Sequence, residues 1–285
     1  MIAQILVATD FSPRSDRALR RGILLARQNA TELLLTHVVD DDQPQRLIDV
    51  ERREAAALLD ELASTIRESD GIECQSHVAI GDAFEGIVRM AEESGVDLLV
   101  LGQHRRQVLR DVFIGTTAER VLRTSRIPVL LANGVPAGPY RKVLIATDLS
   151  NYAYVAADTA KQLGLLATVD MIALHVMDPV ESGPVTRAAM TLKEADDQVA
   201  KLIQRLTDEL AAFARKLGIV AGLRVVSPSE ESTPMAINNY AKETKADLIV
   251  VGTRARSGFE KWLLGSVAEG VLGHAEVDVL AVSSS

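Results

Sequence analysis

Short apolar runs alternate with longer amphipathic stretches along the whole chain. ILVAT at 5–9 and ELLLTHVV at 32–39 are continuous and rich in Val, Ile and Leu, as strands covered on both faces are. Between these runs, residues 15–29 repeat apolar side chains at helical spacing, with arginines on the opposite side. Because strands and helices alternate, we expect a parallel sheet with helices on both faces.

The same alternation predicts the remaining elements of each half. In the first half, we expect helices at 46–69, 83–93 and 116–124 and a closing strand at 128–131. The last apolar run, 277–282, closes the second half in the same way. Each half is therefore predicted to be a small, doubly wound α/β domain with a five-stranded parallel sheet.

The two halves of the chain repeat one another. ILVATDFS at 5–12 returns as VLIATDLS at 143–150. VDLLVLG at 96–102 returns as ADLIVVG at 246–252. A repeat of this length, with every strand in the same order, indicates two tandem copies of one domain.

The repeat sets the predicted domain boundaries. We expect domains at 1–133 and 140–285, joined by NGVPAGPY, which has the Gly and Pro content of a linker. The second copy is longer between its second and fourth strands. We expect its extra residues partly in a longer second helix over 188–216 and partly in the loop 227–233, which would cover the second cleft.

Composition narrows the class of protein. The chain has 285 residues, of which 47% are hydrophobic and 25% charged, as in globular proteins with a buried core. A net charge of −8, scattered basic residues and only 4% aromatic residues argue against nucleic acid or an anionic membrane as partner. No signal peptide or membrane-spanning run is visible, and Cys74 is the single cysteine. We expect a cytoplasmic protein without disulfides or a multi-cysteine metal site.

Candidate chemistry gathers at the ends of the strands. In an open parallel sheet, ligands bind outside the carboxyl ends of the strands, where the winding direction reverses. Strands one, two and four end at Asp10, Val38 and Gly102 in the first copy, and at Asp148, Val176 and Gly252 in the second. A carboxylate there suits a hydroxyl or amine donor, and the backbone after strand two suits a base edge.

A helix start follows strand four in both copies and adds an anion site. Gly265 and Ser266 open the fourth helix of the second copy, as Gly115 and Thr116 do in the first. The free N–H groups and the positive dipole end of such a helix favour a phosphate. Together with the strand ends, the two copies therefore predict two nucleotide clefts, although the same glycines also suit a plain strand-to-helix loop.

Other polar residues have simpler interpretations. His37 and His175 lie inside apolar strands without a pattern of metal ligands, so we expect structural histidines. The run Asp40 to Asp42 suits either a magnesium ion or a solvated loop. No nucleophile elbow, no phosphate-loop lysine and no nucleophile with a base is present in the sequence, so no catalytic residues are predicted.

The combined motifs resemble those of the universal stress protein family, over essentially the whole chain in two copies. ATP-binding members carry GxxGx9G followed by Ser or Thr after strand four. GTRARSGFEKWLLGS at 252–266 is similar at every defining position except the second glycine, which is Ala255. GQHRRQVLRDVFIGT at 102–116 has the same spacing, with Arg105 at that position.

The resemblance implies a Rossmann-like fold of the adenine nucleotide alpha hydrolase type and ATP, with or without magnesium, as ligand. It implies that Asp148 lies near the adenosine, that Val176 offers its backbone to the base, and that Gly252, Gly265 and Ser266 face the phosphates. The first-copy counterparts are Asp10, Val38, Gly102, Gly115 and Thr116. Ala255 would weaken binding through strain or crowding, whereas Arg105 would clamp an anion or fill the cleft, so the second copy is the better candidate.

The sequence leaves two functions open. The first is a stress-response sensor or switch that binds an adenine nucleotide and turns it over slowly, if at all. The second is a nucleotide-free scaffold or chaperone-like protein with degenerate clefts and unidentified protein partners. In either case we expect the copies to pack face to face as an intramolecular pseudo-dimer through their fifth strands, with a homodimer of chains also open. A true hydrolase is disfavoured because a positioned base is missing.

Overall fold

The structure, a computed structural model, describes residues 2–102, 116–177, 192–226, 231–253 and 264–283. The first-copy strands and helices are β1 Gln4–Ala8, α1 Ser15–Asn29, β2 Glu32–Val39, α2 Gln45–Asp70, β3 Cys74–Ile80, α3 Ala83–Ser94, β4 Leu98–Gly102, α4 Thr116–Thr124 and β5 Val129–Ala132. Those of the second copy are β6 Lys142–Ala146, α5 Asn151–Gln162, β7 Asp170–Val176, α7 Leu192–Leu217, β8 Gly222–Val226, α8 Thr233–Thr244, β9 Leu248–Gly252, α9 Ser266–His274 and β10 Asp278–Val282.

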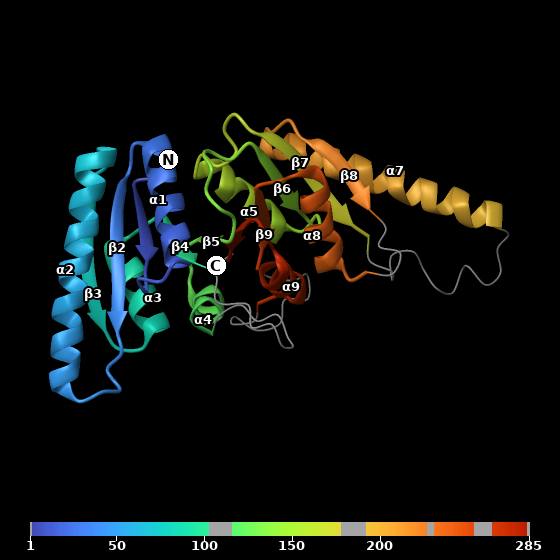
Figure 1. Ribbon diagram of the computed structural model, residues 1–285. Helices are drawn as coiled ribbons and strands as arrows, with labels where there is room; N and C mark the ends of the chain where they lie inside the picture. Colours follow the sequence, from blue (N-terminus) through green and yellow to red (C-terminus); the bar gives the residue numbers. More distant parts are fainter. Residues whose placement is uncertain (1, 103–115, 178–191, 227–230, 254–263, 284–285) are drawn as a thin grey trace.

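The strands form one sheet that runs through the whole molecule (Figure 1). Their order is β3-β2-β1-β4-β5-β10-β9-β6-β7-β8. Within each copy all neighbouring strands are parallel, and the order reverses at β1 and at β6. The predicted pair of doubly wound, five-stranded parallel sheets is therefore confirmed.

The copies join edge to edge through β5 and β10. These two strands are antiparallel, with Leu130 opposite Leu280 and Leu131 opposite Val279. Since Leu130 and Leu280 are also equivalent positions of the repeat, a pseudo-twofold axis passes between them. The prediction that the fifth strands pair is confirmed, but the expected face-to-face packing is wrong. Helices already cover both faces of each sheet, so only the strand edges were left to pair.

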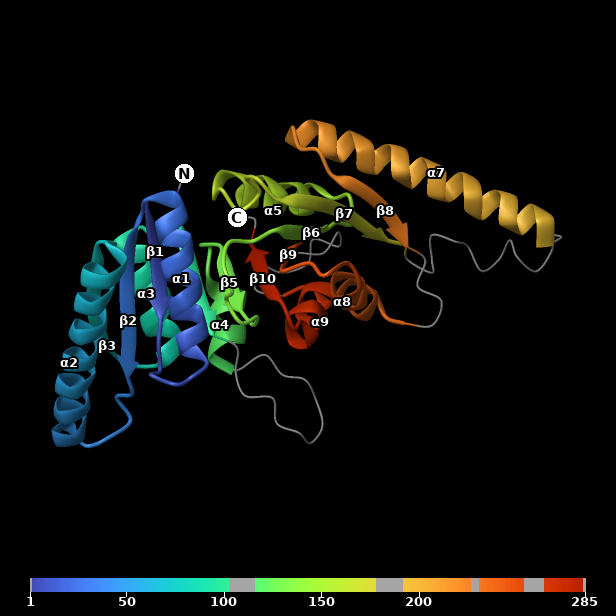
Figure 2. The same ribbon diagram turned by 45° about the horizontal axis from the view of Figure 1, so that its top comes forward.

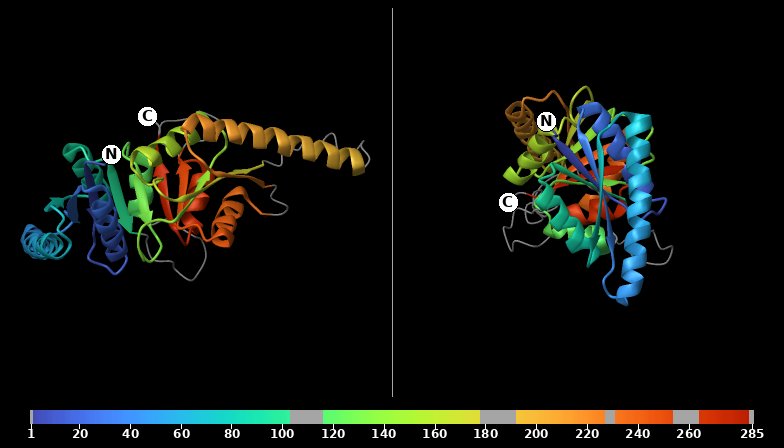
Figure 3. Two further views of the ribbon diagram at one scale, coloured as in Figure 1. Left: turned by 90° about the horizontal axis from the view of Figure 1, so that it is seen from above. Right: turned by 90° about the vertical axis from the view of Figure 1, so that its left-hand side faces the viewer.

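Helices cover the sheet in two layers. Buried side chains of α1, α2, α5 and α7 pack on one face, and those of α3, α4, α8 and α9 pack on the other. Seen from above, α2 and α7 lie toward opposite ends of an elongated molecule, and α7 extends past the last strand (Figures 2 and 3). The strands alternate accordingly, because Ile5 and Val7 face the first layer whereas Leu6 and Ala8 face the second.

The predicted helix boundaries hold closely in the first copy. Helices α1 and α4 begin and end at the predicted residues, and α2 and α3 lie within one residue of prediction. In the second copy, α7 has 26 residues, the same number as α2. The predicted start of this helix at residue 188 lies outside the described residues, so the expected lengthening stays a prediction.

A buried polar cluster fixes the junction between the copies. The Asp278 carboxylate, fully buried at the start of β10, accepts hydrogen bonds from Arg21 Nε and from the Tyr140 hydroxyl, each at 2.7 Å. The same carboxylate accepts the backbone N–H groups of Asn133 and Gly134, each at 2.9 Å. The Asp278 carboxylate thus connects β10 to helix α1 and to the interdomain segment. Burial, together with the charge of Asp278, raises the pKa of Tyr140 well above its usual range, so its hydroxyl keeps the proton that it donates.

Candidate functional site

A strained turn follows the first strand of the first copy. Phe11 has a left-handed backbone with φ of 59°, which is uncommon for a residue with a side chain. The Thr9 hydroxyl holds this turn by accepting the Phe11 N–H at 3.0 Å. Asp10, which lies between Thr9 and Phe11 in the sequence, accepts the N–H of Ser12 at 3.0 Å. The turn therefore fixes a carboxylate at the carboxyl end of β1.

The second copy builds the same turn from equivalent residues. Leu149 has φ of 62°, and its N–H donates to the Thr147 hydroxyl at 2.9 Å. The N–H of Ser150 donates to Asp148 at 3.0 Å, and the Ser150 hydroxyl accepts from Ala153 at the start of α5. Left-handed strain costs about 1–2 kcal/mol per residue, and the same cost at two equivalent positions indicates that the carboxylate placement matters at both.

Hydrogen bonding keeps Asp10 ionised. Partial burial raises the pKa of this carboxyl, but hydrogen bonds from the Ser12 hydroxyl and N–H and from Ser15 outweigh burial and hold the pKa below its ordinary value. At neutral pH the group is an acceptor only. It suits the hydroxyls of a sugar or an exocyclic amine, and it repels a phosphate placed directly beside it.

Glycine at the end of β4 and of β9 allows a close crossing of two backbones. A Cβ atom on Gly102 would lie 2.7 Å from the carbonyl oxygen of Arg14, and one on Gly252 would lie 3.2 Å from that of Tyr152. The start of α1, or of α5, therefore passes directly over the strand end. Gly252 was expected to permit a tight turn toward a ligand, whereas the structure assigns both glycines to this crossing.

The strand histidines make the same contact in both copies. His37 Nδ1 lies 2.8 Å from the carbonyl oxygen of Thr9, and His175 Nδ1 lies 2.9 Å from that of Thr147. Because a carbonyl oxygen only accepts, each ring donates its Nδ1 proton across to the first strand of its copy. Such a bond ties the strand end to the turn, as expected of structural histidines.

In the second copy, all five predicted residues line one cavity. Asp148 comes from the end of β6, Val176 from the end of β7 and Gly252 from the end of β9, while Gly265 and Ser266 begin α9. The cavity has a volume of about 140 Å³ and its walls are completed by apolar side chains, among them Leu174, Ile237, Val251 and Val267. Gly265 is the N-cap of α9, so the free N–H groups of that helix face this end of the sheet.

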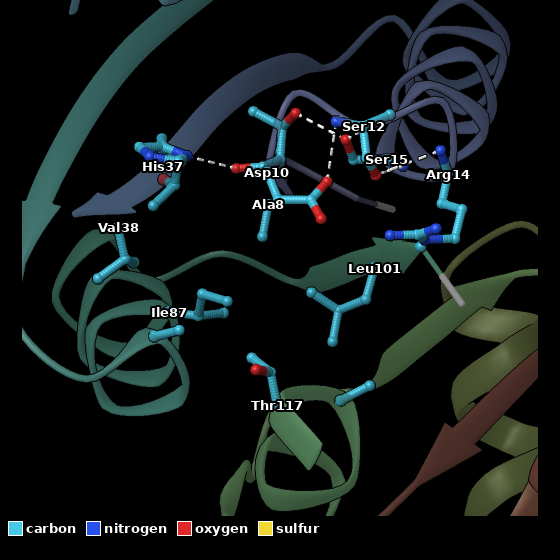
Figure 4. A pocket seen from close by; sticks show the side chains of 15 residues that line it. Ala8, Asp10, Ser12, Arg14, Ser15, His37, Val38, Ile87, Leu101 and Thr117 are labelled. Carbon is cyan, nitrogen blue, oxygen red and sulfur yellow. Dashed lines mark hydrogen bonds between the residues drawn. The ribbon is translucent and has the colours of Figure 1, made fainter. Parts of the chain in front are cut away.

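The first copy has a matching cavity of about 190 Å³ (Figure 4). Asp10, Val38 and Gly102 line it, as predicted. Gly115 lies outside the described residues, and Thr116 begins α4. The next residue of that helix, Thr117, reaches the cavity from below in the view of Figure 4.

Several lining residues of the first cavity were not singled out from the sequence. Arg14, Ser15, Thr36 and Thr117 line it, and the equivalent residues of the second copy are Tyr152, Ala153, Leu174 and Val267. The first cavity is therefore more polar at each of these four positions. An alignment of the two copies could have indicated this difference. At each of these four positions it pairs a polar residue of the first copy with an apolar or aromatic residue of the second.

The acidic run after β2 lies beside the first cavity. Asp40, Asp41 and Asp42 line a groove together with Asp82 and Arg120. This groove shares Val38, Ala83 and Thr117 with the cavity. Within the described residues, no group of three or more His, Cys, Asp or Glu side chains is arranged to hold a metal ion. Asp40 instead accepts the N–H of Asp42 at 2.9 Å, as in a solvated turn.

No helix in the described ranges has both the length and the apolar character needed to cross a bilayer. Cys74 is buried, and burial raises the pKa of its thiol to about 11, so it packs as a small core residue.

Comparisons with known proteins agree on one family. The model of the universal stress protein family matches residues 1–133 and again residues 139–283. A universal stress protein of Methanocaldococcus jannaschii is 31% identical over 151 residues, which are 50% of this chain and 82% of that protein. One of Mycolicibacterium smegmatis is 23% identical over 98% of this chain and 96% of its own length.

A solved structure supports the fold over the full length. The crystal structure of a universal stress protein from Archaeoglobus fulgidus has a TM-score of 0.73 at 22% identity and covers 98% of each chain. At this level of identity the likeness concerns the fold, including its tandem arrangement, and not the ligand.

Proposed function

The chain belongs to the universal stress protein family, and on that premise we propose that it binds ATP or another adenine nucleotide in the second cavity as a sensor or switch. Hydrolysis is at most slow, because no phosphate-binding lysine is among the described residues that line either cavity.

One observation carries this proposal. The five second-copy residues that the family resemblance assigns to adenosine, base and phosphates come from three strand ends and one helix start, and they line a single cavity. Three of them, Asp148, Val176 and Gly252, are far apart in the sequence. Such convergence at the carboxyl edge of a doubly wound sheet is typical of nucleotide sites.

The chemistry of the cavity fits the parts of a nucleotide. Its walls at Leu174, Ile237 and Val251 are apolar and suit the faces of a base. Asp148 supplies an acceptor for a hydroxyl or an amine, and the N-terminus of α9 at Ser266 supplies N–H donors for a phosphate. With a volume of about 140 Å³ the cavity encloses only part of such a ligand, so the phosphates would lie toward the rim.

A second function rests on a departure from the family motif. Ala255 and Arg105 replace the second glycine of the ATP-binding pattern in the two copies, and both lie outside the described residues. If these side chains close the clefts, the protein works as a nucleotide-free scaffold or chaperone-like partner. In either form we propose action in the cytoplasm through an unidentified protein partner, with a homodimer as a further level of assembly.

The first test asks whether nucleotide is present and where it binds. Protein purified under native conditions is denatured, the released nucleotides are identified by chromatography, and ATP is then titrated calorimetrically into the nucleotide-free protein. Asp148→Asn keeps the size of the side chain but removes its charge. We expect about a tenfold or greater loss of affinity at one class of site, because a hydrogen bond to a charged group contributes about 1.5–3 kcal/mol.

Asp10→Asn is the matched control in the first copy, and it should leave the second-cavity affinity unchanged. A wild-type protein that releases no nucleotide and gives no heat with ATP would contradict the switch and favour the scaffold. Loss of affinity in Asp10→Asn alone would move the site to the first copy.

A further inference from the structure

The first cavity contains a cation, Arg14, that forms no ion pair with a described residue, although the Asp10 carboxylate lines the same cavity. Arg14, directly before α1, is partly buried and lines the cavity. In Figure 4 its guanidinium points toward the cavity from the side opposite Val38 and Ile87. Within the described part of the chain, no side-chain hydrogen bond or ion pair reaches this guanidinium. An arginine stays charged at any pH at which the protein is folded, so partial burial without a partner has a cost that an anion would offset.

A buried hydroxyl without a partner lies in the same cavity. Thr36 on β2 is fully buried, and its hydroxyl oxygen makes no hydrogen bond in the described structure. Most buried polar side-chain atoms are hydrogen-bonded, so an orphan that lines a cavity points to a missing partner there. The equivalent residue of the second copy is Leu174, which leaves no such group in the second cavity.

The helix start completes the anion-binding side. Helix α4 has nine residues, and Thr117 and Ala118 of its first turn line the cavity, so its positive dipole end faces the same space as Arg14. The acidic groove of Asp40 to Asp42 adjoins the cavity through Val38, Ala83 and Thr117, so carboxylates also lie near this helix start. Arg14 lines the cavity but not the groove, and the anionic end of a ligand would therefore lie on the Arg14 side.

We propose that the first cavity is a second nucleotide site, in which Arg14 binds a phosphate group and makes affinity depend on the charge of the ligand. At the equivalent positions of the second copy, Leu174 and Val267 line the second cavity and Tyr152 does not. No lysine or arginine is among the described residues that line this cavity, so its affinity depends less on phosphate. The two copies thus differ in what they recognise: the first distinguishes a nucleotide from a nucleoside, and the second accepts both. This inference rests on the proposed adenine-nucleotide function.

The test compares ATP with adenosine in calorimetric titrations of the full chain. In Arg14→Gln, we expect the affinity of one site for ATP to fall about tenfold or more, because a charge-assisted hydrogen bond is lost. Affinity for adenosine should change less than twofold. Arg14→Lys keeps the charge and should recover part of the loss. Tyr152→Gln, the matched change in the second copy, should leave the ratio of ATP to adenosine affinity unaltered.

Each other outcome has a definite meaning. If Arg14→Gln lowers the affinity for ATP and for adenosine equally, or lowers neither, Arg14 does not bind a phosphate group and the inference is overturned. Inorganic tripolyphosphate separates this inference from the function on which it rests. If wild-type protein binds tripolyphosphate but not ATP, and Arg14→Gln abolishes that binding, the anion site stands and the adenine nucleotide does not. If neither compound binds, both proposals fail.

Discussion

At the scale of single residues, the two glycines at the strand ends, Gly102 and Gly252, leave different amounts of space for a Cβ atom. A methyl group on Gly102 would meet the Arg14 carbonyl oxygen at 2.7 Å, closer than real Cβ atoms come to backbone. On Gly252 the closest contact, to the Tyr152 carbonyl oxygen, would be 3.2 Å, which a small shift relieves. The crossing of helix start over strand end is therefore tighter in the first copy.

Alanine at these positions should have unequal effects. We expect Gly102→Ala to destabilise the protein by about 1–3 kcal/mol, because the α1 backbone must move. Gly252→Ala should cost clearly less, since only a few tenths of an ångström are needed. Urea unfolding followed by circular dichroism measures both, each variant being the control of the other. Equal losses would contradict the difference in crossing distance.

Single-residue predictions from the sequence succeeded where a rule of the fold selected the position. The carboxyl ends of parallel strands meet at one edge, so Asp148, Val176 and Gly252 were predicted to lie together and they do. Arg14 was not predicted to line the cavity because it precedes a helix, where arginine is an ordinary solvated residue. Thr36 was not predicted either, because a hydroxyl inside an apolar strand usually has a hydrogen-bond partner.

At the scale of elements, one carboxylate links α1, the interdomain segment and β10. Asp278 is fully buried and Arg21 nearly so, with 5% of its side chain exposed. The Arg21 guanidinium also lies over the Tyr140 ring at 4.1 Å. Repeat equivalents of Asp278 and Arg21 are Pro128 and Thr159, so the cluster exists on one side of the pseudo-twofold axis only.

Removal of this charge should be costly. We expect Asp278→Asn to lower the free energy of unfolding by about 3–5 kcal/mol, because it leaves Arg21 buried without its counter-charge. Asp97→Asn is the control, since Asp97 accepts the N–H groups of Ala3 and Gln4 at a more exposed strand entry. Thermal and urea unfolding compare the two variants. A loss for Asp278→Asn no larger than that for Asp97→Asn would show that the junction does not depend on the cluster.

Element boundaries followed from the sequence, but contacts between distant elements did not. Buried parallel strands read as continuous apolar runs, which is why α1 and α4 were bounded correctly between them. The predicted start of the second-copy helix at residue 188 lies outside the described residues, in which α7 begins at Leu192. Nothing in the local pattern near Asp278 indicates that Arg21, remote in the sequence, would contact it.

At the scale of the whole molecule, the tandem chain encloses two related but unequal cavities in one continuous sheet. Antiparallel pairing of β5 with β10 turns the second copy by half a turn relative to the first. Each copy keeps the strained turn that fixes its aspartate, at Phe11 and at Leu149. The walls differ, since Arg14 and Thr36 stand where the second copy has Tyr152 and Leu174. We propose that duplication with divergence of this kind gives one chain two ligand preferences.

Equilibrium dialysis of labelled ATP against the wild-type chain freed of nucleotide tests the nucleotide function and both cavity assignments most directly. We expect saturable binding that approaches two ATP molecules per chain, with one class of site losing affinity as salt is raised because it depends on Arg14. Saturation at one ATP per chain would contradict the assignment of both cavities. No saturable binding at all would contradict the nucleotide function and leave the scaffold.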